Sequence, residues 1–138
     1  MKSFRDVISI KSKKKEECIN ITNMVEKIVE RSGIKDGFVL IFPLHTSCGV
    51  FINDSDFNIT KDWMKIARKI IPEDDKYLHN EVDYKKNADG HLKGILTGHH
   101  VIIPITDGKL DLGTYHTIYY YETDGMREKE VLIKIIGE

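Results

Sequence analysis

The sequence is poor in cysteine, in net charge and in long hydrophobic runs. Its two cysteines, Cys18 and Cys48, are too few for a disulfide framework and lack the spacing of a zinc knuckle. We therefore expect reduced thiols in a cytoplasmic protein. No segment approaches the roughly 20 apolar residues of a membrane helix, and residues 1–10 lack the apolar run of a signal peptide. The sequence predicts no membrane partner.

Several motifs of well-known chemistry are also missing. The chain has no glycine-rich phosphate loop, no G-x-S-x-G elbow, no dinucleotide fingerprint and no H-E-x-x-H metal helix. Its formal net charge of −1 provides no overall field that would hold a polyanion. Nucleic acid is therefore not expected as a partner.

The 138 residues, 41% hydrophobic and 31% charged, have the composition of one globular domain spanning 1–138. Apolar residues at helical spacing follow Thr22 and Asn58, and a short helix is expected between Asn87 and Gly98. Seven segments have strand character: 3–10, 17–21, 38–42, 48–52, 100–105, 115–121 and 131–136. The order ββ-α-ββ-α-(short α)-βββ predicts an α+β fold with about seven strands in one or two antiparallel sheets.

Two finer expectations concern connections. The first two strands are close enough in sequence to form a hairpin across the lysine-rich turn. Residues 72–87 form a long polar segment without a clear pattern, and such a loop in a compact domain often serves as a wall or lid of a site.

Candidate chemical residues gather where the expected elements meet. Four histidines are candidate site residues, and they lie in a turn, a long loop, a short helix and a strand, respectively: His45, His79, His91 and His116. Any one of them taken alone is more often a surface or hydrogen-bonded core residue. Asp62 on the second helix and Arg127 after a tight turn could bind charge, although both are equally consistent with solvated surface residues. Ser47 and Cys48 near His45 suggest a nucleophile, but no orienting third group is evident.

Four stretches together resemble a known family. They are HTSCGVFIND, NADGHLKG, LTGHHVIIPITDGKLDLGTYHTIYYYE and DGMREKEVLIKIIGE. In order and spacing they are similar to the YjbQ-like family of small proteins, usually described as uncharacterised or as secondary thiamine-phosphate synthase enzymes. The resemblance covers nearly the whole chain. It implies a seven-stranded antiparallel β-sandwich with flanking helices, assembled as a homotrimer with sites near subunit boundaries.

The resemblance also implies roles for particular residues. The matching positions are His45 of an H-T-[ST] motif, Asn53 of an N-E pair, Asp62, His79, His91, His116 and Arg127. Asp54 stands where the family has glutamate, Tyr115 where it has tryptophan, and His116 where it has glutamine. The implied catalytic residues are His45, Asp62, His91 and His116; the implied substrate-binding residues are Asn53, Lys93 and Arg127; and the implied ligands of a divalent metal, Zn or Mg, are His45, His79 and His91.

The expected function is that of a small-molecule enzyme acting on a phosphorylated or anionic substrate, with weak thiamine-phosphate synthase activity as a side reaction. Such chemistry needs cations that stabilise departing phosphate charge and usually a divalent metal. The alternative is a non-catalytic trimeric module that binds a small anion or metal. A purely structural or interaction protein is the third hypothesis. Which histidines converge in space is left open by the sequence.

Overall fold

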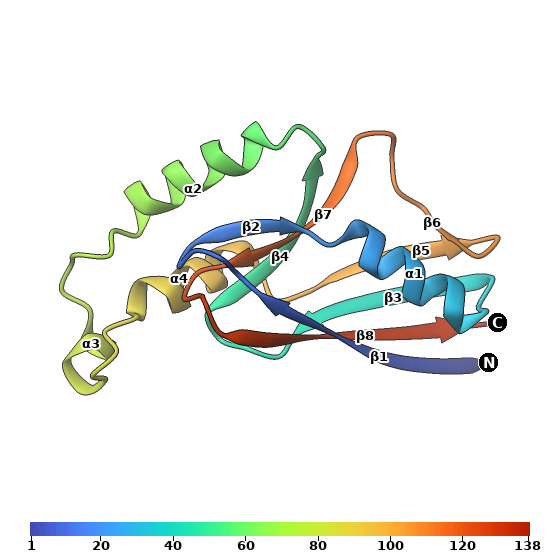
Figure 1. Ribbon diagram of the computed structural model, residues 1–138, viewed down its shortest axis with the longest axis horizontal. Helices are drawn as coiled ribbons and strands as arrows, with labels where there is room; N and C mark the ends of the chain where they lie inside the picture. Colours follow the sequence, from blue (N-terminus) through green and yellow to red (C-terminus); the bar gives the residue numbers. More distant parts are fainter.

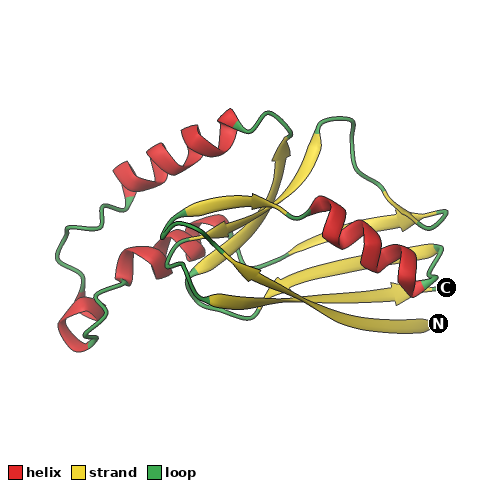
Figure 2. Ribbon diagram, in the orientation of Figure 1, coloured by secondary structure: helices red, strands yellow, loops and turns green.

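The structure is a computed structural model that describes all residues from Met1 to Glu138. It contains eight strands and four helices (Figures 1 and 2). The elements are β1 (Lys2–Lys11), β2 (Glu17–Asn20), α1 (Thr22–Ser32), β3 (Asp36–Pro43), β4 (Cys48–Asp54), α2 (Asn58–Ile70), α3 (Leu78–Val82), α4 (Ala88–Thr97), β5 (Val101–Thr106), β6 (Lys109–Leu110), β7 (His116–Glu122) and β8 (Glu128–Gly137).

The strands form two antiparallel sheets. The larger has the order β1-β8-β3-β5-β6, and the smaller has the order β2-β7-β4. Both sheets contribute to one core of 18 buried residues, in which α1 packs through Val25, Ile28 and Val29. On β8 the buried positions alternate, so that Val131 and Ile133 enter the core while their neighbours face outward. This period of two is what a half-buried strand requires.

Strand β7 is buried on both faces, which explains its run of large apolar and aromatic residues from Ile118 to Tyr121. Ile118 and Tyr120 belong to the main core, while Tyr119 and Tyr121 form a second, smaller cluster with Cys18. Trp63 of α2 packs against that cluster. Helix α2 therefore contacts the outer face of the smaller sheet through Trp63 and Met64.

The α+β class is confirmed, but the number of strands is not seven. The chain has an additional two-residue strand, β6, directly after the Asp107-Gly108 turn, and an additional one-turn helix, α3, inside the long polar segment. Both elements are too short to produce a recognisable hydrophobic period. No helix is long and apolar enough to span a membrane.

The predicted hairpin between the first two strands is wrong. Strand β1 pairs with β8, whereas β2 pairs with β7 in the other sheet. The lysine-rich turn therefore carries the chain from one sheet to the other. Both strands have the apolar alternation of a strand, but that alternation does not identify the partner, because any strand with a matching apolar face can satisfy it.

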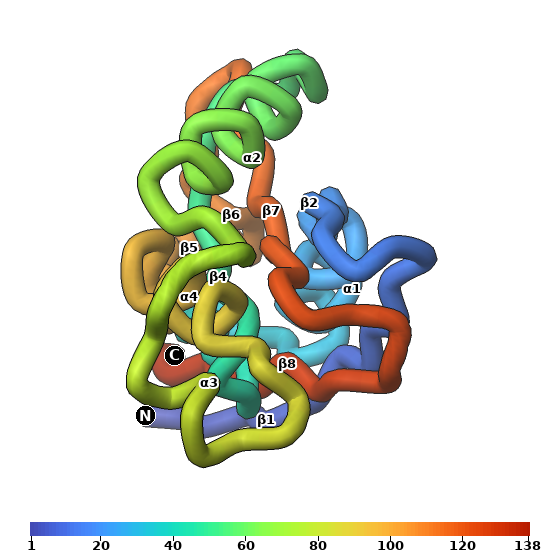
Figure 3. Tube along the Cα trace, turned by 90° about the vertical axis from the view of Figure 1, so that its left-hand side faces the viewer, coloured from blue at the N-terminus to red at the C-terminus, as the bar shows by residue number.

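Helices α2, α3 and α4 lie at the end of the molecule opposite the two termini. Figure 1 shows this segment on the left, and Figure 3, viewed from that side, shows it in front of the sheets. Residues 71–87 connect α2 to α4 and pass close to the turn between β3 and β4. The turn before β4, the long polar segment and the start of α4 therefore meet at this end.

Candidate functional site

The site begins with a close contact between α4 and the start of β4. A Cβ atom added at Gly94 would lie 2.8 Å from the carbonyl oxygen of Cys48, and one added at Gly49 would lie 2.7 Å from the side chain of Thr97. The helix therefore rests almost directly on the strand backbone, which only glycine permits at these positions. This contact brings His91, one turn before Gly94, next to the turn that precedes β4.

His91 is held by that turn through one ring nitrogen. Its Nδ1 lies 2.6 Å from Ser47 Oγ and 3.3 Å from the carbonyl oxygen of Thr46. A carbonyl oxygen can only accept a hydrogen bond, so the proton of the neutral ring is assigned to Nδ1. The other nitrogen, Nε2, then carries the free lone pair. A neutral histidine held in this way can accept a proton at Nε2 as a general base, and the protonated ring can then donate it as a general acid.

His79 lies edge-on against His91. The ring centroids are 4.8 Å apart and the ring planes are inclined by 78°. Its Nε2 lies 3.2 Å from Asn87 Oδ1 and 3.1 Å from Asp83 Oδ2. Asn87 is itself fixed, because its Nδ2 donates to Asp124 Oδ2 at 2.8 Å. The expected wall of the site is therefore tied to the start of α4 by its own side chains.

His91, Asn87 and Asp83 border a cavity of about 390 Å³, which we call the His91 pocket. Its lining residues are His45, Thr46, Ser47, Asp83, Tyr84, Lys85, Asn87, His91, Arg127 and Lys129. Three permanent cations and two histidines face a single carboxylate across this pocket. Burial, followed by the charge of Lys129, lowers the pKa of His45 below its ordinary value. The pocket thus combines positive charge with a neutral histidine.

A buried ion pair supports the floor of the His91 pocket. The ammonium of Lys129 contacts the carboxylate of Glu122, and the two side chains are 1% and 0% exposed. Lys129 Nζ also donates to the carbonyl oxygen of Ser47 at 3.2 Å, and the hydroxyl of Tyr120 donates to Glu122 at 3.0 Å. The pair therefore fixes the backbone of the turn that holds His91.

Lys129 was not among the residues predicted to form the site, although its position in β8 carries a signal. Lys129 shares its strand parity with Val131, Ile133 and Ile135, all of which point into the core. A lysine at an inward position of such a strand is rarely buried without a partner. The alternation could therefore have identified Lys129 as a buried lysine that needs a partner. It could not have identified Glu122 as that partner.

The structure brings His45, His79, His91 and Arg127 together and places the other predicted residues elsewhere. Asn53 and Asp62 line a separate cavity between α2 and β4. His116 lies at the exposed start of β7, where its Nδ1 accepts a hydrogen bond from the Gly113 amide at 2.9 Å. Within one chain, His116 and Asp62 therefore do not face His91.

Lys93 also lies outside the His91 pocket. Its side chain is buried, and its ammonium lies 3.2 Å from Glu16 Oε2 and 3.6 Å from Asp89 Oδ2. The hydroxyl of Tyr121 donates to the other oxygen of Glu16 at 2.7 Å. Lys93 thus has two carboxylate partners inside the protein. Its predicted role in binding substrate has no support from its position in this chain.

The predicted metal ligands were tested against the donor geometry. No group of three or more His, Cys, Asp or Glu side chains is positioned to hold one ion. Nδ1 of His91 faces Ser47, and Nε2 of His79 faces Asn87 and Asp83. Within this chain the three histidines do not converge on one metal position. Metal binding by His45, His79 and His91 stays a prediction.

Comparison with known proteins gives consistent results across the chain. The family described as "UPF0047 protein YjbQ-like" matches residues 6–138. A UPF0047 protein of Methanothermobacter thermautotrophicus is 31% identical over 138 residues, covering 100% of this chain and 95% of that protein. One of Archaeoglobus fulgidus is 36% identical over 129 residues, covering 94% and 98%. The crystal structure of a YbjQ-like protein of unknown function from Sulfolobus solfataricus superposes with a TM-score of 0.94, at 33% identity over 99% of both chains.

Proposed function

The chain belongs to the YjbQ-like UPF0047 family, and from this premise we propose that the His91 pocket binds a phosphorylated or otherwise anionic small molecule on which His91 acts as general acid–base. The observation that carries the proposal is the arrangement of His91. Its Nδ1–H is held by Ser47 and Thr46, so that Nε2 is left as the basic nitrogen beside a group of cations.

The charges around the pocket favour an anion. Arg127 shares one guanidinium nitrogen with Asp124 at 3.4 Å and is 51% exposed, so its other donors are free to bind phosphate or carboxylate oxygens. Lys85 adds a second cation from the segment after α3. Tyr84 is the only hydrophobic lining residue, so the pocket suits a polar ligand better than an apolar one.

The proposed chemistry follows from these roles. Arg127 and Lys85 bind the anionic group and offset the charge that develops on it in the transition state. His91 accepts a proton at Nε2 from the attacking group and returns it to the leaving group, while Ser47 keeps the ring in place. Weak thiamine-phosphate synthase activity, which the family resemblance implies, belongs to the same proposal as a side reaction of this pocket.

Binding of inorganic phosphate and pyrophosphate, measured by isothermal titration calorimetry, tests the anion site. We expect Arg127→Gln to weaken binding roughly tenfold, because one charge-assisted contact is lost. Arg68→Gln is the matched control, since Arg68 is 55% exposed, also lies near a carboxylate, and is outside the His91 pocket. Equal affinities of the two variants would place the anion elsewhere.

The titration of His45 gives an independent test. Because burial and Lys129 lower the pKa of His45, the fold favours the neutral ring. The neutral His45 ring therefore contributes to stability at pH values above its ordinary pKa of about 6.5. This contribution is lost as the pH falls through the lower pKa of the folded state. A bound anion favours the charged ring, so added phosphate should raise the pKa of His45. NMR of the His45 Cε1–H signal, assigned with His45→Asn, measures both; a midpoint above 6.5 without phosphate would contradict the expectation.

A trimer, also implied by the family resemblance, is part of this proposal. The face of the larger sheet that points away from the core is apolar on neighbouring strands: Phe38 and Ile102 are 44% and 56% exposed, and Leu40 pairs directly with Ile102 in the register. Patches of this kind commonly mark subunit contacts. We propose that this face is a contact between subunits.

Sedimentation equilibrium checks the assembly. We expect three times the monomer mass for the unmodified protein and a smaller species for Ile102→Glu, because a charge would be buried in the contact. Val82→Glu is the control, since Val82 is exposed on α3, away from the sheet. A monomeric unmodified protein, or an Ile102→Glu variant that keeps its full mass, would rule out this contact.

A further inference from the structure

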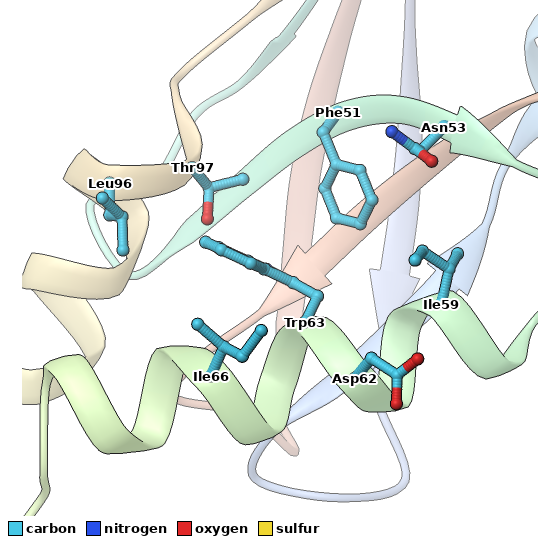
Figure 4. A pocket seen from close by; sticks show the side chains of 8 residues that line it. All are labelled: Phe51, Asn53, Ile59, Asp62, Trp63, Ile66, Leu96 and Thr97. Carbon is cyan, nitrogen blue, oxygen red and sulfur yellow. The ribbon is translucent and has the colours of Figure 1, made fainter.

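A second cavity lies on the other side of the smaller sheet, and its chemistry is opposite to that of the His91 pocket. It encloses about 360 Å³ between α2, β4 and the end of α4 (Figure 4), and we call it the Trp63 pocket. Its lining residues are Phe51, Asn53, Ile59, Asp62, Trp63, Ile66, Leu96 and Thr97. We propose that the Trp63 pocket binds a small amphipathic amine, with an aromatic or branched aliphatic body and a protonated amino group.

The walls of the Trp63 pocket suit the apolar body. In Figure 4, Phe51 from β4 and Trp63 from α2 extend toward each other, and Ile66 and Leu96 close one side. Ile66 and Leu96 are 50% and 46% exposed, so a ligand would remove apolar surface from water. That transfer is favourable by about 25 cal/mol for each Å².

The two aromatic walls are held in place before any ligand binds. Trp63 packs edge-on against Tyr121 at a centroid distance of 6.2 Å, and Phe51 packs against Tyr119 at 5.3 Å. Both tyrosines are buried. A preformed aromatic site loses little conformational entropy on binding, and the faces of its rings attract a cation.

Asp62 and Thr97 favour a cationic group in the Trp63 pocket, while the Asn53 amide and the unpaired indole N–H of Trp63 can donate to an acceptor on the rest of the ligand. Asp62 is the only charged lining residue, and it takes part in none of the ion pairs of the protein. The hydroxyl of Thr97 donates to the carbonyl oxygen of Lys93 at 2.8 Å, so toward the cavity it can only accept. Lys65 and Arg68 of the same helix lie outside the lining. An ammonium group, which only donates, complements these acceptors.

This proposal does not depend on the function proposed for the His91 pocket. The two cavities have no lining residue in common, and one is lined by cations while the other has a single carboxylate. A failure to bind phosphate would therefore leave the amine proposal intact, and the reverse also holds.

Trp63 is the only tryptophan of the chain, so its fluorescence reports directly on this cavity. The probes are phenethylamine, phenethyl alcohol and 3-phenylpropionate, which share an aromatic body but carry a positive, no, or a negative charge. We expect a saturable fluorescence change with phenethylamine, weaker binding of the alcohol and the weakest binding of the anion. No saturable change, or an anion that binds as tightly as the amine, would overturn the proposal.

Two variants make the test specific. Asp62→Asn should weaken phenethylamine about two- to fivefold, the size of an exposed ion pair, and leave phenethyl alcohol unchanged. Asp74→Asn, which removes an exposed carboxylate from the loop after α2, should change neither. Equal effects of the two variants on the amine would show that only net charge matters. Protection of Trp63 from acrylamide in an oligomer that binds no probe would instead show that a second copy fills the cavity, and would overturn the proposal.

Discussion

Replacing Lys129 with methionine is expected to lower the free energy of unfolding by about 3–5 kcal/mol, because a fully buried carboxylate is left without its partner. Glu122 is 0% exposed, and Tyr120 is its only other side-chain partner. The same substitution removes the donor to the carbonyl oxygen of Ser47. Urea unfolding followed by circular dichroism measures the loss, and phosphate binding measures the accompanying change in the His91 pocket.

Two further variants give this prediction its controls. Lys134→Met changes the same residue type on the same strand, but Lys134 is only half-buried and forms no ion pair, so a change within about 0.5 kcal/mol is expected. The double variant Lys129→Met/Glu122→Leu removes both charges and should recover much of the loss. A Lys129→Met protein as stable as the unmodified chain would mean that Glu122 is not charged in the folded state.

Replacing His91 with glutamine is expected to reduce turnover of a phosphorylated substrate by roughly 10²- to 10⁴-fold, the usual contribution of a general acid–base. The amide keeps the approximate size of the ring but cannot carry a proton between groups. Release of phosphate or pyrophosphate by the purified protein measures the reaction, with a phosphomonoester or the thiamine-phosphate precursors as substrate. Thermal unfolding establishes that the variant is folded.

The control for His91 is His100→Gln, because His100 is exposed and stacks on Phe42, away from the pocket. Ser47→Ala should reduce turnover less than His91→Gln, since the carbonyl of Thr46 still holds the ring. A folded His91→Gln protein with full activity would exclude His91 as the catalytic residue. Phosphate binding without turnover in the unmodified protein would favour the non-catalytic binding module.

Most of the secondary structure could be predicted because its causes are local. The helix that begins at Thr22 ends at Gly33, where φ is 71°, a conformation that glycine adopts without strain. The turn at 44–47 lies between two strands, as the proline after the apolar run indicated. The short elements α3 and β6 could not be predicted, because five and two residues are too few to show a period.

The candidate site was only partly accessible from the sequence. Histidines at element ends could be selected by residue type and position: His45 and His91 line one cavity, and His79 contacts His91. The family resemblance could not show that Asp62 and His116 lie elsewhere in the chain. The sequence placed Ser47 near His45 as a possible nucleophile, whereas in the structure its hydroxyl lies against His91, 44 residues away.

The sequence by itself determined the α+β class, the family and the faces of most strands and helices, because these follow from residue patterns within a few positions. Only the tertiary structure decided which strands pair, which residues share a cavity and which charges are buried. Lys129 and Ser47 are separated by 82 residues, and their contact depends on how β8, β7 and the turn before β4 pack together. Such contacts arise from the summed packing of many residues, which no local pattern records.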